Sequence, residues 1–181
     1  MTFSIVILVV FLGVGATIVM DLWALILKLC GQSTLNFSLV GRWVGYMING
    51  QFIHRPSIGQ KAIIPAENAL GWGVHYVTGI IFAFIFILLV GEIWFTSPVL
   101  WPALLFGIIT VAAPYFIMQP AMGAGIAASK VPNPNKARLM SLLSHSVFGL
   151  GLYLTGLVLQ PLLTYFLWLS WVKHFIIQSE K

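Results

Sequence analysis

The stretches GWGVHYVTG, residues 71–79, and SLLSHSVFG, residues 141–149, decide how this chain folds. Each places a histidine inside an uncharged segment, with a small residue four positions before it and a glycine four positions after it. The two histidines are His75 and His145. Residues four apart are neighbours on the surface of an α-helix. Small residues at this spacing let membrane helices approach closely, so each frame predicts a tight helix crossing that contains an imidazole.

The composition of the chain places both frames in a membrane protein. Of its 181 residues, 60% are hydrophobic and 7% are charged, whereas about 25% of the residues in a typical soluble domain are charged. We therefore expect a single integral membrane domain over residues 1–181. Cys30 is the one cysteine, which excludes an internal disulfide and a cysteine-based metal cluster. The net charge of +5 is typical of basic membrane loops, so no nucleic-acid partner is expected.

Four apolar stretches are long enough to cross a bilayer as helices, which takes about 20 residues each. They cover residues 2–29, 68–90, 99–118 and 139–163. The sequence therefore predicts an all-α, polytopic membrane protein built as a four-transmembrane-helix bundle. Pro114 and Pro120 predict that the third of these helices is irregular. The aromatic run at 164–177 is predicted to be a further segment in the membrane interface.

The connection between the first two spans is predicted to contain an amphipathic helix that lies in the interface. Between residues 35 and 49, apolar residues recur at helical spacing opposite a polar face, and Asn49-Gly50 is a typical helix stop. His54 is also expected in this interface. The residues predicted to contact lipid headgroups, which are anionic, are Arg42, Trp43, Arg55 and Lys61.

The basic residues predict an orientation in the membrane. They gather in the connection after the first span and in the connection at 123–138, whereas the short link between the second and third spans contains only Glu92. Cytoplasmic loops carry an excess of Lys and Arg. Both basic loops are therefore expected in the cytoplasm, and both termini on the opposite side of the membrane.

Polar side chains from all four spans are predicted to meet in the cytoplasmic leaflet. The second and fourth spans reach His75 and His145 within about two turns of the cytoplasmic loops, and the first and third spans end near Asp21 and Gln119. Polar groups that face lipid are costly, so these four should point inward and contact one another. The matching frames also suggest two parallel repeats, in which Asp21 corresponds to Gln119 and His75 to His145.

Two further residues are expected behind this polar cluster, namely Tyr76 and Glu67. Glu67 opens the second span after Pro65, where a carboxylate favours the positive end of the helix dipole. Capping of the helix and a proton relay towards His75 are both open roles for Glu67.

Three roles for the polar cluster stay open. It can bind a small solute, an ion or protons in a transport-type protein, because histidine titrates near neutrality. It can hold together a non-catalytic membrane subunit by hydrogen bonds between helices. The two histidines can also ligate a b-type haem, as in other helix bundles. Neither a metal site nor an enzyme is predicted, since the ligands are scattered and no nucleophile–base pair is present. Because four helices enclose little volume, a homodimer or another membrane-protein partner is considered.

Longer segments around these residues resemble a known protein family. They are GRWVGYMINGQFIH, ENALGWGVHYVTG, APYFIMQPAMGAGIAASKVPNP and SLLSHSVFGLGLYL. The chain resembles the DUF2938 proteins over about residues 13–160, and the Met-Gln-Pro-Ala segment at 118–121 is the most specific part. The resemblance implies a small four-span protein of the bacterial inner membrane. It implies no activity, because none is assigned to that family.

Overall fold

The structure is a computed structural model that describes the backbone of residues 3–179 and the side chains of residues 4–165. These residues form helices and connecting loops, with no strand among them. Four helical segments are long and apolar enough to cross a membrane: α1 (Phe3–Leu29), α3 (Glu67–Val90), the stretch Leu100–Ala121, and α6 (Pro134–Ser179). The prediction of an all-α fold with four spans is confirmed, and by length and composition this is a multi-pass membrane protein.

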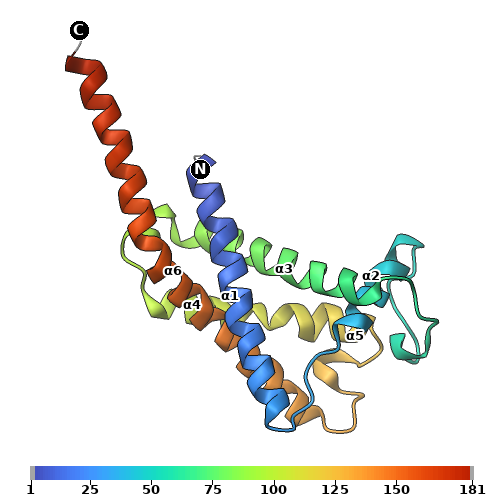
Figure 1. Ribbon diagram of the computed structural model, residues 1–181. Helices are drawn as coiled ribbons and strands as arrows, with labels where there is room; N and C mark the ends of the chain where they lie inside the picture. Colours follow the sequence, from blue (N-terminus) through green and yellow to red (C-terminus); the bar gives the residue numbers. More distant parts are fainter. Residues whose placement is uncertain (1–2, 180–181) are drawn as a thin grey trace.

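The helices form two pairs that run in different directions. Figure 1 shows α1 beside α6, while α3 and α4 (Leu100–Thr110) cross this pair. α1 packs on both α3 and α6, and α4 packs on α6, whereas α3 and α4 contact each other little. The beginning of α1 and the end of α6 lie on the same side of the molecule, away from the loops around α2 (Phe37–Ile48). The helices therefore meet near their middles and diverge towards their ends.

Glycines hold the helices together where they cross. A Cβ atom on Gly13 of α1 would lie 2.5 Å from the Ile80 Cα in α3, beside Gly79. A Cβ atom on Gly107 of α4 would lie 2.5 Å from the Gly149 Cα in α6. These distances are shorter than any Cβ contact allows, so the backbones themselves are in contact. The predicted role of the glycines four residues after each histidine is confirmed at Gly79 and Gly149.

Backbone contact at glycines also joins α1 to α6 and α2 to α3. A Cβ atom on Gly151 would lie 2.9 Å from the Ala16 Cα, which places α6 directly against α1. A Cβ atom on Gly41 of α2 would lie 2.7 Å from the Gly71 backbone nitrogen at the start of α3. Gly71, the small residue before His75, therefore packs against α2 rather than against a spanning helix.

α2 occupies the place predicted for the helix at 35–49. Asn36 caps its start, since the side-chain Oδ1 accepts a hydrogen bond of 3.0 Å from the Ser38 backbone N–H. The helix ends before Asn49, and Gly50 follows with a φ of +73°. A 3₁₀ turn at Ile58–Gln60, η1, then leads towards α3.

The third span is interrupted, as its prolines predict. α4 ends at Thr110, and the chain continues through a π-helical turn, η3 (Pro114–Met118), into the single turn α5 (Gln119–Ala121). Within η3 the Gln119 N–H donates to the Pro114 carbonyl five residues earlier, which is the π-helical pattern. π-helical turns occur frequently at functional sites. The irregular third helix is therefore confirmed.

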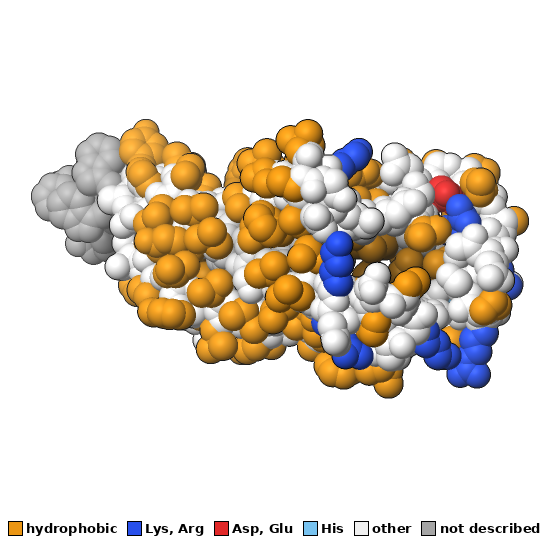
Figure 2. All heavy atoms as spheres, turned by 90° about the horizontal axis from the view of Figure 1, so that it is seen from below, with side chains coloured by type: hydrophobic (Ala, Val, Ile, Leu, Met, Phe, Trp, Pro, Cys, Tyr) orange, Lys and Arg blue, Asp and Glu red, His pale blue; other side chains and the backbone are white. Residues whose placement is uncertain are grey.

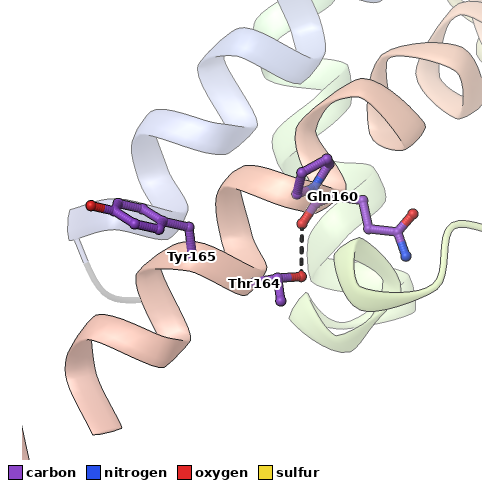
Figure 3. Close-up of a pocket in the computed structure, with 4 residues that line it drawn as sticks. Gln160, Thr164 and Tyr165 are labelled. Atoms are coloured by element: carbon purple, nitrogen blue, oxygen red, sulfur yellow. Dashed lines mark hydrogen bonds between the residues drawn. The ribbon is translucent and has the colours of Figure 1, made fainter. Parts of the chain in front are cut away.

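The C-terminal end of α6 differs from the prediction, because the segment at 164–177 is not separate from the fourth spanning helix. The backbone of the segment at 164–177 continues α6 to Ser179 without interruption, while its side chains from residue 166 onward lie outside the described residues. A shallow depression of about 530 Å³ lies beside Pro161 (Figure 3). Its residue Gln160 donates a 2.8 Å hydrogen bond to the Thr96 carbonyl in η2 (Glu92–Thr96), which ties α6 to the link before α4. This depression lies at the opposite end of the molecule from α2.

We predict that Gly107→Ala destabilises the protein, whereas Gly73→Ala does not. The added methyl group at Gly107 would meet the α6 backbone, and overpacking of this kind typically costs about 1–3 kcal/mol. Apart from its chain neighbours and the nearby backbone of its own helix, a Cβ on Gly73 would meet no atom within 4 Å. Alanine also favours a helix by about 1 kcal/mol over glycine. Thermal unfolding in detergent should show a lower midpoint for Gly107→Ala alone. Equal midpoints for the two variants would contradict the crossing.

Candidate functional site

A cavity of about 770 Å³ lies where the spanning helices diverge from the glycine crossings. Its walls come from α1, α3, the broken third span and α6, with α2 and the preceding link as a further wall. Figure 2 shows a hollow on the face where Lys and Arg side chains gather. All four members of the predicted polar cluster line the cavity, namely Asp21, His75, Gln119 and His145. The expectation that four helices enclose little volume is wrong, because the helices diverge instead of packing along their whole length.

Asp21 and His75 form a hydrogen-bonded pair on the cavity wall. The His75 Nε2 lies 2.9 Å from the Asp21 Oδ1, and the Tyr76 hydroxyl donates to the Asp21 Oδ2 over 2.8 Å. The His75 ring also packs on Phe37 of α2, with 4.5 Å between ring centroids. Helix α1 thus supplies the carboxylate, and α3 supplies both of its partners. The structure brings these three predicted residues into direct contact.

His145 has a different partner. The Thr110 hydroxyl donates to the Gly107 carbonyl over 2.6 Å, and the same oxygen lies 2.8 Å from the His145 Nδ1. This geometry directs the hydroxyl proton to the Gly107 carbonyl and so assigns the donor role to Nδ1; in a neutral imidazole, Nε2 is then an acceptor. The crossing at Gly107 brings Thr110 next to His145. His145 is therefore hydrogen-bonded to Thr110 and not to Asp21 or His75.

Gln119 lines the cavity at the end of the π-helical turn. Its Nε2 donates to the Ser141 Oγ over 3.4 Å, and its Oε1 is buried with no hydrogen-bond partner among the described residues. Ser141 is the small residue of the second frame. Measured from the crossing glycines, Asp21 follows Gly13 by eight residues, whereas Gln119 follows Gly107 by twelve. Asp21 and Gln119 therefore lie about one helical turn apart when the two halves of the chain are aligned on their crossing glycines. The two histidines occupy matching positions in this alignment, whereas Asp21 and Gln119 do not.

Arg42 and Glu67 form an ion pair away from the cavity lining. The Arg42 Nε and Nη2 lie 2.8 and 2.9 Å from the two Glu67 carboxylate oxygens, and the side chains are 9% and 13% exposed. The Arg42 Nη1 donates to the Lys61 carbonyl over 3.0 Å. The hydrogen bond to Glu67 raises the pKa of Arg42 above its usual value. This pair ties α2 to the first turn of α3, and both carboxylate oxygens of Glu67 accept a hydrogen bond from Arg42.

This pairing gives both residues partners that the sequence did not predict. Arg42 was expected among the headgroup contacts, but the close packing of α2 on α3 turns it inward to Glu67. Glu67 is not among the residues that line the cavity, and its Oε2 also accepts from the Ile64 N–H over 3.3 Å at the start of α3. Trp43 lines the cavity and donates to the Phe52 carbonyl over 2.9 Å.

Two members of the headgroup set remain on the surface. Arg55 and Lys61 are exposed, so contact between their side chains and lipid headgroups stays a prediction.

His54 is buried, although it was expected in the interface. Its side chain is 1% exposed, and neither ring nitrogen has a hydrogen-bond partner in the described part of the chain. The ring packs edge-on against Tyr46, with 5.6 Å between centroids, and the His54 N–H donates to the Ala121 carbonyl over 2.8 Å. A non-helical loop has no periodicity that would reveal a buried face. No signal in the sequence therefore indicated this burial.

Comparison with known protein families finds a match for the chain. The profile of the family described as "Protein of unknown function (DUF2938)" matches residues 10–159. The chain belongs to the DUF2938 family. The match includes the four polar residues of the cavity, and the predicted resemblance is confirmed. No curated protein and no solved structure is significantly similar to this DUF2938 chain.

We predict that Arg42→Met and Glu67→Gln each lower the midpoint of thermal unfolding by several degrees. Each substitution leaves one poorly exposed member of the pair without its partner. The loss in the double variant should be smaller than the sum of the two single losses. Arg55→Met is the matched control, because Arg55 is exposed, and it should leave the midpoint unchanged. Additive losses would show that the two side chains do not stabilise the fold as a pair.

Proposed function

We propose that this DUF2938 protein is a transport-type protein of the bacterial inner membrane, which binds a small solute in its cavity and exchanges protons at Asp21 and His75. The observation that carries the proposal is the carboxylate–imidazole pair on the wall of a cavity of about 770 Å³. Cavities of about 300–1,000 Å³ are typical of ligand sites. A purely structural cluster would pack its polar groups against one another, with no space beside them.

The Asp21–His75 pair is suited to hold one exchangeable proton. With the proton bound the pair is neutral overall, and without it the pair carries one negative charge. Tyr76 donates to the second carboxylate oxygen and keeps Asp21 oriented towards His75. The other ionisable side chains that line the cavity are His145 and Lys28. The charge of the cavity therefore depends on this one pair more than on any other group in it.

The orientation of the cavity follows from its basic surroundings. Its opening lies on the face where Lys and Arg side chains gather (Figure 2). By the positive-inside rule this face is cytoplasmic and both termini are periplasmic. The exposed Arg55 and Lys61 would then contact anionic headgroups of the cytoplasmic leaflet. All of the residues that line the cavity in this structure come from one chain.

One observation favours the alternative, a structural membrane subunit. The hydrogen bond between His145 and Thr110 joins α6 to α4 in the manner of interhelical polar contacts. A structural role explains the hydrogen bond at Nδ1 of His145. It does not explain why a cavity lies beside Asp21. Access of water to the cavity therefore distinguishes the two functions.

We predict that a thiol at position 144 reacts with a water-soluble maleimide, whereas a thiol at position 146 reacts poorly. Ser144 lines the cavity, while Ser146 of the same helix does not, and its hydroxyl donates to the Leu142 carbonyl. The variants Ser144→Cys and Ser146→Cys are made in a Cys30→Ser background, because Cys30 is an exposed free thiol. Labelling is measured by mass spectrometry in nanodiscs. Protection of both thiols would overturn the proposed function.

A further inference from the structure

We infer that the solute is a small organic cation that carries N–H groups on an apolar or aromatic body. This inference rests on the proposed function and names the chemistry that the cavity would recognise. It depends on three properties of the cavity: its hydrogen-bonding atoms, its charge and its walls.

Two hydrogen-bond acceptors of the cavity wall, on His145 and Gln119, have no donor among the described residues. Nε2 of the neutral His145 is an acceptor, because Nδ1 donates to Thr110, and no residue in the described part of the chain bonds it. The Gln119 Oε1 is a buried acceptor without a donor. Buried polar atoms without partners are costly, so a ligand that donates hydrogen bonds is favoured here. A solute with only acceptor groups would leave both atoms unsatisfied.

The charge of the cavity favours a cation in its depth. Among the described residues that line it, Asp21 supplies the one carboxylate and Lys28 the one ammonium group. Lys28 follows Asp21 by seven residues along α1, which places their backbones about 10 Å apart along the helix axis. An anion beside Asp21 would be repelled by its carboxylate, and an unpaired charge is costly to bury. A cation beside Asp21 meets a carboxylate that is already oriented by Tyr76.

The walls of the cavity are suited to an apolar or aromatic body. Five aromatic side chains line it: Phe37, Trp43, Trp72, Phe82 and Phe148. The faces of aromatic rings, above all those of Trp, attract organic cations. Two of these rings already pack around His75, with 4.5 Å from its ring to Phe37 and 5.9 Å to Trp72. The acceptors, the single carboxylate and the aromatic walls therefore favour the same class of ligand.

The test compares three probes that share one aromatic body and differ in their head group. They are 2-(1-naphthyl)ethylammonium, 2-(1-naphthyl)ethanol and 3-(1-naphthyl)propanoate. Binding to the full chain in nanodiscs is measured by equilibrium dialysis at pH 7, against empty nanodiscs that correct for partition into lipid. We expect the ammonium probe to bind at least about tenfold more tightly than the other two.

Substitutions of Asp21 and Gln119 then test whether these two residues cause the preference for the ammonium probe. Asp21→Asn should weaken binding of the ammonium probe by about tenfold and leave binding of the alcohol unchanged. Gln119→Leu should weaken binding of the ammonium probe by a similar factor. Glu92→Gln is the matched control, since it makes the same change from carboxylate to amide in η2, outside the cavity, and should have no effect. If Asp21→Asn fails to fold, Gln119→Leu alone carries the test, because its change removes no ion pair.

Each outcome has a distinct meaning. Equal binding of the three probes, or preference for the propanoate, overturns the cation inference and leaves the solute-binding cavity in place. Failure of all three probes to bind, with the thiol at position 144 still reactive, also overturns the inference. Failure of that thiol to react overturns the proposed function itself, whichever probe binds.

Discussion

Contact between helix backbones at glycines is the constraint on which the rest of this structure depends. Gly13 lies against Gly79 and Ile80, and Gly107 lies against Gly149, at distances that admit no side chain. Inside a bilayer there is no hydrophobic force that pulls helices together, so close packing of small residues has to replace it. Crossings that are this tight let the helices diverge on either side without separating. The cavity is the space that this divergence leaves. The framed histidines lie at its walls because each comes one helical turn before its crossing glycine, Gly79 or Gly149.

Features of the fold that depend on local patterns could be predicted from the sequence. The spans follow from runs of apolar residues, the irregular third helix from Pro114, and the approach at Gly79 and Gly149 from four-residue spacing. The contact between Asp21 and His75 was also predictable, since a carboxylate in a bilayer must find a polar partner. These predictions needed only the periodicity of a helix and the cost of polar groups in lipid.

Features that depend on tertiary packing could not be predicted. Arg42 and Glu67 are 25 residues apart, and only the seating of α2 on α3 brings them together. The partner of His145 is Thr110, a residue that attracts no notice in an apolar helix. The volume of the cavity depends on how far the helices diverge, which no pattern of residue types reveals. The two halves share a frame in sequence, yet one pairs its histidine with a charged group and the other with a hydroxyl.

The π-helical turn at Pro114–Met118 has a geometric consequence for the cavity. It contains one residue more than an α-helical turn at the same position, and each residue of an α-helix corresponds to a rotation of about 100°. If the turn tightened to α-helical geometry, everything beyond it would rotate by that amount relative to α4. Gln119 follows the turn directly, so its place on the cavity wall depends on the extra residue in the turn. The π-helical turn therefore sets which side of the broken span faces the cavity, whereas the glycine crossings set how closely the helices approach.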